Sequence, residues 1–206
     1  MDISVDDIRL SDLYQHLLRI IVPRPIAWVS TISAEGISNL APFSFFSGVG
    51  VRPPSLLFCP SNRRDGKDKD TLRNIRANHE FVINVVPESL ATVMNSCAAE
   101  LPEQESEFET FGVPMARSLM VSPPGVATSP VRIECRLLDV ISLASGPGAA
   151  NIVIGSILHL HLDDNVLDTA GFVDPSLLHV IGRMGGAAYC RTLDQFELPR
   201  PDGSRG

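Results

Sequence analysis

The sequence of 206 residues has no glycine-rich phosphate loop, no cysteine pairs and no long apolar run. Its four cysteines lie far apart without a CxxC motif, which argues against a zinc cluster or a disulfide framework and favours reduced thiols in a cytoplasmic protein. They are Cys59, Cys97, Cys135 and Cys190. No apolar run approaches the roughly 18 residues that cross a bilayer, and the acidic start lacks the features of a signal peptide. We therefore expect neither a membrane span nor a nucleoside triphosphate site of the Walker type.

Basic residues are also few, with 17 Lys and Arg against 24 Asp and Glu and a net charge of −7. This balance argues against nucleic acid, because a surface that binds phosphate backbones needs clustered Lys and Arg. The basic residues that do cluster are Arg63, Arg64, Lys67 and Lys69. The cluster is either a site for a small anion or a solvated loop, and charge alone does not choose between them.

Two catalytic arrangements are missing as well. No GxSxG segment is present, so a hydrolase with a nucleophile elbow is not expected. His159 and His161 would share a strand face near Asp163, but a third nitrogen or sulfur ligand at diagnostic spacing is missing, so we expect no metal. Cys59 is interpreted as a small buried apolar residue rather than a reactive thiol.

The pattern of apolar residues predicts a mainly β protein with peripheral helices. Strands are expected at 26–33, 37–46, 55–59, 80–86, 131–144 and 151–164, and helices at 11–19, 70–80 and 88–99. Pro42 should place its strand at an edge or bend it, and Asp70 is the expected N-cap of the second helix. Residues 101–129 should be dominated by loops. Because no βαβ alternation occurs, we predict a β-barrel: a single domain at 1–198, followed by a flexible tail at 199–206.

Three segments present polar groups that could meet a ligand. Ser30 and Thr31 are adjacent hydroxyls at a strand end, and 39–46 (NLAPFSFF) combines an amide, a proline and aromatic rings. The third is the loop with Ser61, Arg64 and Lys69, which runs into the helix start at Asp70 and Thr71, where free N–H groups favour phosphate. A strand end, an aromatic core and a solvated loop are the plainer interpretations. Together the segments suit a ligand with a flat ring at one end and a phosphate at the other.

Three ordered segments resemble the flavin-reductase-like, FMN-binding split-barrel proteins. They are RPIAWVSTISAEGISNLAPFSFF (24–46), PPSLLFCPSNRRDGKDKDTLRNI (53–75) and EFVINVV (80–86), and a looser likeness continues through 151–164 and 182–192. The resemblance implies FMN as the cofactor, a homodimer and a split β-barrel. It implies that the flavin ring and ribityl chain meet Ser30, Thr31, Asn39, Ala41, Ser44 and Phe45. It implies that the ribityl and phosphate end meets Ser61, Arg64, Lys69, Asp70 and Thr71.

The resemblance also makes His161, Arg183 and Tyr189 candidates to approach the flavin from later strands or from the partner chain. In such proteins the flavin carries the electron chemistry, and backbone N–H groups near Ser44 and Phe45 would stabilise the reduced ring. NADH or NADPH as donor rests on the family alone, because the segment 146–151 (GPGAAN) lacks the last glycine of a Rossmann fingerprint.

Two functional classes therefore remain. One is an NAD(P)H-dependent flavin oxidoreductase, which could serve an oxygenase partner. The other is a non-enzymatic FMN-binding electron carrier served by a partner reductase. Residues 101–129 have no role in the family pattern and could shape the substrate pocket.

Overall fold

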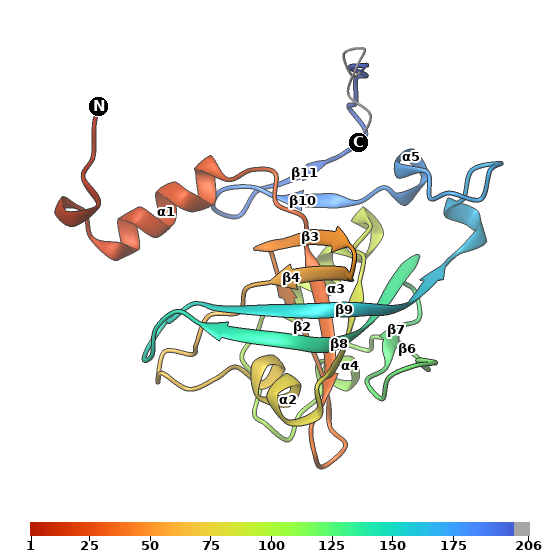
Figure 1. Cartoon of the computed structure of the whole chain (residues 1–206), viewed down its shortest axis with the longest axis horizontal. Helices are drawn as coiled ribbons and strands as arrows, with labels where there is room; N and C mark the ends of the chain where they lie inside the picture. The colour runs from red at the N-terminus through yellow and green to blue at the C-terminus, as the bar shows by residue number, and fades with distance from the viewer. Residues whose placement is uncertain (200–206) are drawn as a thin grey trace.

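A computed structural model describes residues 1–199, so the tail expected at 199–206 lies outside the described residues except for Pro199. Its main sheet has seven antiparallel strands (Figure 1). They are β1 (Ala27–Ile32), β2 (Ser38–Phe43), β3 (Phe46–Val51), β4 (Pro54–Phe58), β5 (Glu80–Asn84), β8 (Val131–Ser142) and β9 (Asn151–Leu162). Their spatial order is β2-β1-β5-β8-β9-β4-β3.

The sheet must curl, because its two edge strands follow each other in the chain. β2 ends at Phe43 and β3 begins at Phe46, so only Ser44 and Phe45 connect the two edges. With about 3.8 Å between successive Cα atoms, the edges can be no more than roughly 11 Å apart at this corner. β2 and β3 do not pair with each other, so the barrel is split along this seam. The fold is the mainly β split barrel that the sequence predicts.

Alternating side chains of β1 separate two apolar clusters. Ala27 and Val29 face the barrel interior, where Phe43, Phe58 and Phe81 pack with ring centroids 5.1 and 5.6 Å apart. On the opposite face, Trp28 packs with Leu40, Met94 and Phe108 in the second cluster. Because both faces of β1 are covered, its consecutive residues Ala27, Trp28 and Val29 are all apolar and fully buried.

Short elements surround the barrel. The helices are α1 (Leu10–Ile20), α2 (Asp70–Asn78), α3 (Ala91–Ser96), α4 (Glu107–Thr110) and α5 (Pro175–Leu178), with 3₁₀ turns at Val5–Asp7, Glu88–Leu90 and Asp164–Val166. Two small ribbons are β6 (Met115–Ala116) with β7 (Gly125–Val126), and β10 (Ile181–Arg183) with β11 (Tyr189–Arg191). Leu72 and Ile75 of α2 complete the interior cluster, while α1 extends away from the barrel (Figure 1). No helix in the described part of the chain is both long and apolar enough to span a membrane.

Three local predictions need correction. The strand expected at 37–46 ends at Phe43, and β3 was missed because Gly48 and Gly50 weaken its strand pattern. Lys69, not Asp70, is the N-cap of α2, because Asp70 is already helical and its carboxylate pairs with Arg73 at 2.7 Å instead of capping. The same helix ends at Asn78 rather than at residue 80, since His79 takes a left-handed conformation. Pro42 lies on edge strand β2 as predicted, where its missing N–H costs no ladder bond.

Candidate functional site

The candidate site is a groove along edge strand β2, which we call the β2 groove. Two hollows of about 80 and 170 Å³ share Pro42, Phe43 and Ala98 in their walls, so they adjoin. The first reaches Asn39 and the start of α2, and the second reaches Ser44 and the β10–β11 ribbon. From Asn39 to Ser44 the strand rises roughly 3.3 Å per residue, about 16 Å in all. The groove thus has two distinct ends.

The α2 end of the β2 groove offers hydrogen-bond donors and one free cation. The Asn39 amide donates to the Thr71 hydroxyl oxygen at 3.0 Å, so the hydroxyl proton of Thr71 remains available to a ligand. Arg73 is the first helical residue whose N–H reaches a carbonyl, that of Lys69, so the N–H groups before it are the free donors of a helix start. Lys69 forms no ion pair within residues 1–199, and its ammonium lies 6.0 Å from the Phe43 ring centroid. This end suits an anion such as phosphate.

Charged side chains flank this end. The Asp70 carboxylate lies 2.7 Å from Arg73 and 3.7 Å from Arg63, so its charge is largely balanced, and it holds the Arg63 guanidinium beside the groove. Glu107, 6 % exposed, accepts the Leu40 N–H at 2.8 Å. Burial raises the pKa of Glu107 and the Asp70 charge adds to that rise, while the Leu40 N–H opposes it.

The other end of the β2 groove is amphipathic. The Arg183 guanidinium stacks over the Tyr189 ring at 4.5 Å, and the Tyr189 hydroxyl donates to Asn95 at 3.1 Å. Ser44 lines the same hollow and accepts a hydrogen bond from Arg24 at 3.2 Å. This combination of aromatic, apolar and polar surface suits the face and edge of a planar ring.

Arg24 is a buried cation behind this end, only 2 % exposed. Besides Ser44, its guanidinium donates to the carbonyls of Leu18 at 2.6 Å, Ile21 at 2.8 Å and Met184 at 3.1 Å. Burial lowers the pKa of Arg24, and the nearby charge of Arg183 lowers it further. No carboxylate within the described residues pairs with it. Arg24 therefore joins α1, the barrel and the loop after β10.

The structure brings eight of the predicted site residues to the β2 groove. They are Asn39, Ala41, Ser44, Lys69, Asp70, Thr71, Arg183 and Tyr189. Ser30 and Thr31 are fully buried instead: Ser30 donates to Pro124 O at 2.6 Å, and Thr31 accepts from Asn74 at 3.1 Å.

The remaining four predicted residues also lie outside the walls of the groove. Phe45 is half-buried with Arg24 stacked on its ring at 5.8 Å, and Ser61 is exposed and bridges to Ala150. Arg64 is exposed on the loop. His161 lies on β9 opposite Arg132, and burial together with the Arg132 charge lowers the pKa of His161. Within one chain these four do not join the others.

Sequence reasoning missed several residues of the groove. Arg63 was noted only as one charge of the basic loop, although its side chain, unlike that of Arg64, lines the groove. Asn95, Leu101 and Glu107 come from segments without a binding motif. Glu107 is one of four glutamates between residues 103 and 109, and the sequence does not distinguish the buried one from the others. Loop 101–129 therefore contributes Leu101 and Glu107 to the groove, and its segment 115–122 lines a separate cavity of about 570 Å³ with Glu80 and Pro124.

The residues present fit an FMN molecule. The unpaired Lys69 and the free N–H groups of α2 match a phosphate. The stacked Arg183 and Tyr189 at the far end match a planar ring.

Comparison with known proteins identifies a family and several relatives. Residues 18–188 match the flavin reductase like domain. An uncharacterized protein from Deinococcus radiodurans is 40 % identical over 194 residues, 91 % of this chain and 84 % of its own length. Protein YwrF of Bacillus subtilis is 37 % identical over 201 residues, 96 % of this chain and 98 % of its own length.

Two solved structures are similar along nearly the whole chain. Nitrilotriacetate monooxygenase component B from Bacillus cereus is 33 % identical with a TM-score of 0.90, covering 96 % of this chain and 98 % of its own. The 2-nitrobenzoate 2-nitroreductase of Pseudomonas fluorescens is 29 % identical with a TM-score of 0.89, covering 100 % of this chain and 99 % of its own. From the matched domain and these relatives, the chain belongs to the flavin-reductase-like family of split-barrel proteins.

Proposed function

We propose that the chain binds one FMN in the β2 groove and uses it as an NAD(P)H-dependent flavin oxidoreductase. One observation carries the proposal. The groove has the cation Lys69, which forms no ion pair, and the start of α2 at one end, and the aromatic, hydrogen-bonding wall of Arg183 and Tyr189 about 16 Å away at the other. The family and its oxidoreductase relatives support the same assignment.

Each end of the groove has its own role in this proposal. Lys69, Thr71 and the N–H groups that begin α2 bind the phosphate, with Arg63 beside them. Ser44 and the backbone around it orient the ring, and the positive charges of Arg24 and Arg183 favour extra negative charge on it. When bound, the flavin supplies the hydride and electron transfer.

Six predicted site residues do not line the groove of the single chain, and in the proposal they either support it from behind or contact the flavin of a neighbouring copy. They are Ser30, Thr31, Phe45, Ser61, Arg64 and His161. Ser30 and Thr31 support the strand from inside, and Phe45 supports Arg24. His161, Ser61 and Arg64 are on the surface and would reach a flavin from a neighbouring copy.

A homodimer is part of the proposal. Both hollows are smaller than the roughly 300–1,000 Å³ of an ordinary ligand pocket, so a flavin in the groove would stay partly uncovered. Helix α1 has no buried residue in the single chain and exposes Leu10, Tyr14, Leu17 and Ile20. A second copy would cover this apolar helix and complete the groove.

An oxygenase that accepts the reduced flavin is the proposed downstream partner, supported by the similarity to a monooxygenase component B. A cytoplasmic location is proposed with it and is supported by the four free cysteines.

The test is anaerobic mixing of the FMN-loaded protein with NADH or NADPH. We expect the flavin absorbance band to bleach with one or both nicotinamides. If neither bleaches the band while dithionite does, the reductase proposal is wrong and the chain is an FMN-binding electron carrier. If no FMN binds, both assignments fail.

A further inference from the structure

The loop between β4 and α2, residues 61–69, carries four basic residues but has little regular structure of its own. Three of its backbone N–H groups donate within the loop: Arg63 to Lys67 O at 2.8 Å, Gly66 to Arg63 O at 3.0 Å and Lys67 to the Asp65 carboxylate at 3.0 Å. Something outside the loop must fix its position, because a free loop of this length would sample many conformations.

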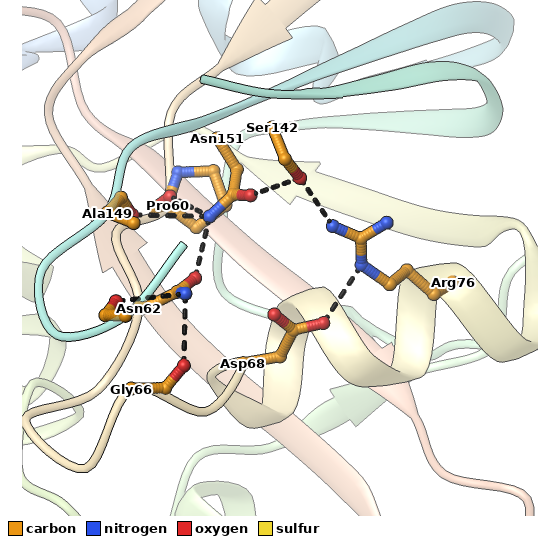
Figure 2. A network of polar contacts seen from close by, with 9 residues as sticks. Pro60, Asn62, Gly66, Asp68, Arg76, Ser142, Ala149 and Asn151 are labelled. Atoms are coloured by element: carbon orange, nitrogen blue, oxygen red, sulfur yellow. Dashed lines mark hydrogen bonds and ion pairs between the residues drawn. The ribbon is translucent and has the colours of Figure 1, made fainter. Parts of the chain in front are cut away.

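The support is a network of polar side chains that spans the loop and the tip of the β8–β9 hairpin (Figure 2). Asn151, 1 % exposed, donates to the Asn62 side-chain oxygen at 2.8 Å, and Asn62 donates to the Gly66 carbonyl at 3.1 Å. On its other side, Asn151 accepts from the Ser142 hydroxyl at 2.7 Å. Ser142 and Asn151 are the last paired residues of the hairpin ladder.

The network returns to the same loop through α2. Arg76 donates to Ser142 at 2.9 Å and to the Asp68 carboxylate at 2.9 Å (Figure 2). Each side chain in the series donates to the next: Arg76 to Ser142, Ser142 to Asn151 and Asn151 to Asn62. The loop is thus held at Gly66 and again at Asp68, on either side of Lys67.

Backbone packing adds to this support. Asn62 also donates to the Gly146 carbonyl at 3.2 Å, and its own N–H donates to Ala149 O at 2.9 Å. Gly66, at φ +83°, lies so close to Gly146 that an added Cβ would meet backbone atoms at 3.3 Å. The glycine-containing segment 146–151 is therefore the tip of a hairpin that meets the basic loop, and not a dinucleotide site.

Arg63 and Lys69 lie on either side of the anchored points and line the β2 groove. We propose that Asn62 and Asn151 are positioning residues for phosphate recognition, which fix the 61–69 loop so that its cations are in place before the ligand arrives. The inference rests on the proposed function. A loop that is ordered before binding loses less conformational entropy when the ligand binds. Because the loop would contact only the phosphate, this saving should raise the affinity for FMN but not the affinity for a flavin without phosphate.

The test compares FMN with riboflavin, which has the same ring without the phosphate, on the full-length protein. The variants are Asn62→Ala and Asn151→Ala. The matched control is Asn78→Ala. Asn78 lies on α2 and its side chain donates to the Ile32 carbonyl of β1, so the variant also loses an asparagine hydrogen bond but not one to the loop. Thermal midpoints are measured for each, and if Asn151→Ala does not fold, Asn62→Ala carries the test.

We expect FMN affinity to fall on the order of tenfold in both variants while riboflavin affinity changes less than about threefold. Asn78→Ala should keep the wild-type ratio of the two affinities. An unchanged ratio in Asn62→Ala and Asn151→Ala, with a wild type that does prefer FMN, would overturn the inference alone. A parallel loss of both ligands would overturn it too, because the network would then support the fold and not the phosphate site. A wild type without preference for FMN would overturn the proposed function instead.

Discussion

In the proposed FMN site, Lys69 and Thr71 are the residues that bind the phosphate. Replacing both by Ala should lower FMN affinity ten- to a hundredfold, because a lost hydrogen bond to a charged group costs about 1.5–3 kcal/mol. Riboflavin affinity should change far less, and titration of both ligands measures the difference. Lys67→Ala is the control, since it removes the same charge from an exposed position of the loop. Equal weakening of FMN and riboflavin would show that the phosphate lies elsewhere.

Glu107 makes the stability of the protein depend on pH. Because burial raises the pKa of Glu107, its contribution to stability is present below its ordinary pKa of 4.5 and is lost as the pH rises through the raised value. Glu107→Gln keeps an acceptor for the Leu40 N–H without the charge. The variant should therefore gain stability relative to wild type between about pH 4 and pH 8, measured by urea unfolding. A stability difference that is the same at both ends of this range would contradict the assignment.

At the residue scale, the sequence predicted those groove residues that lie close together along one strand or at the start of one helix. Asn39, Ala41 and Ser44 follow one strand, and Lys69 with Thr71 begin one helix. Prediction was weaker where a side chain's direction depends on tertiary packing. Ser30 and Thr31 are polar but point into the protein, toward Pro124 and Asn74, which come from distant parts of the chain.

At the scale of elements, Arg24 connects α1, β2 and the loop after β10. Arg24→Met should lower the free energy of unfolding by about 2–4 kcal/mol, because three part-buried carbonyls lose the charged donor that the buried Arg24 supplies. Chemical denaturation measures the loss. Arg9→Met, which removes an exposed ion pair to Asp12, should cost less than about 1 kcal/mol. Similar costs for the two variants would mean that Arg24 does not anchor these elements.

The elements themselves could be predicted to different degrees. The long strands β8 and β9 were expected at nearly their observed positions, since apolar and polar residues alternate along parts of both. The glycine-rich β3 gave no such signal, because it is stabilised by pairing with β4 rather than by its own residues. The polar network includes the hydrogen bond between Asn62 and Asn151, which lie 89 positions apart in the sequence, so no local sequence pattern could predict it.

At the scale of the whole molecule, the proposed homodimer depends on the exposed apolar face of α1. Leu17→Glu would place a charge in the proposed contact between copies, and it should shift the protein from dimer toward monomer in sedimentation equilibrium. The substitution should spare the fold of the barrel, since α1 has no buried residue in the single chain. A wild type that sediments as a monomer would refute the proposed dimer.

The barrel class followed from the number of strands and the absence of βαβ alternation, but the seam did not. The sheet curls because Ser44 and Phe45 alone join its two edges, and this connection was hidden inside a single predicted strand. The groove beside β2 therefore required the structure, while the motifs alone already suggested the proposed ligand, with a flat ring at one end and a phosphate at the other.

The proposed FMN site is tested most directly by equilibrium dialysis of the purified protein against FMN and against riboflavin. We expect one FMN per chain, bound at least about tenfold more tightly than riboflavin, because Lys69 and the start of α2 would bind the phosphate. Equal affinity for the two flavins, or no binding of either, would contradict the assignment of the β2 groove as an FMN site.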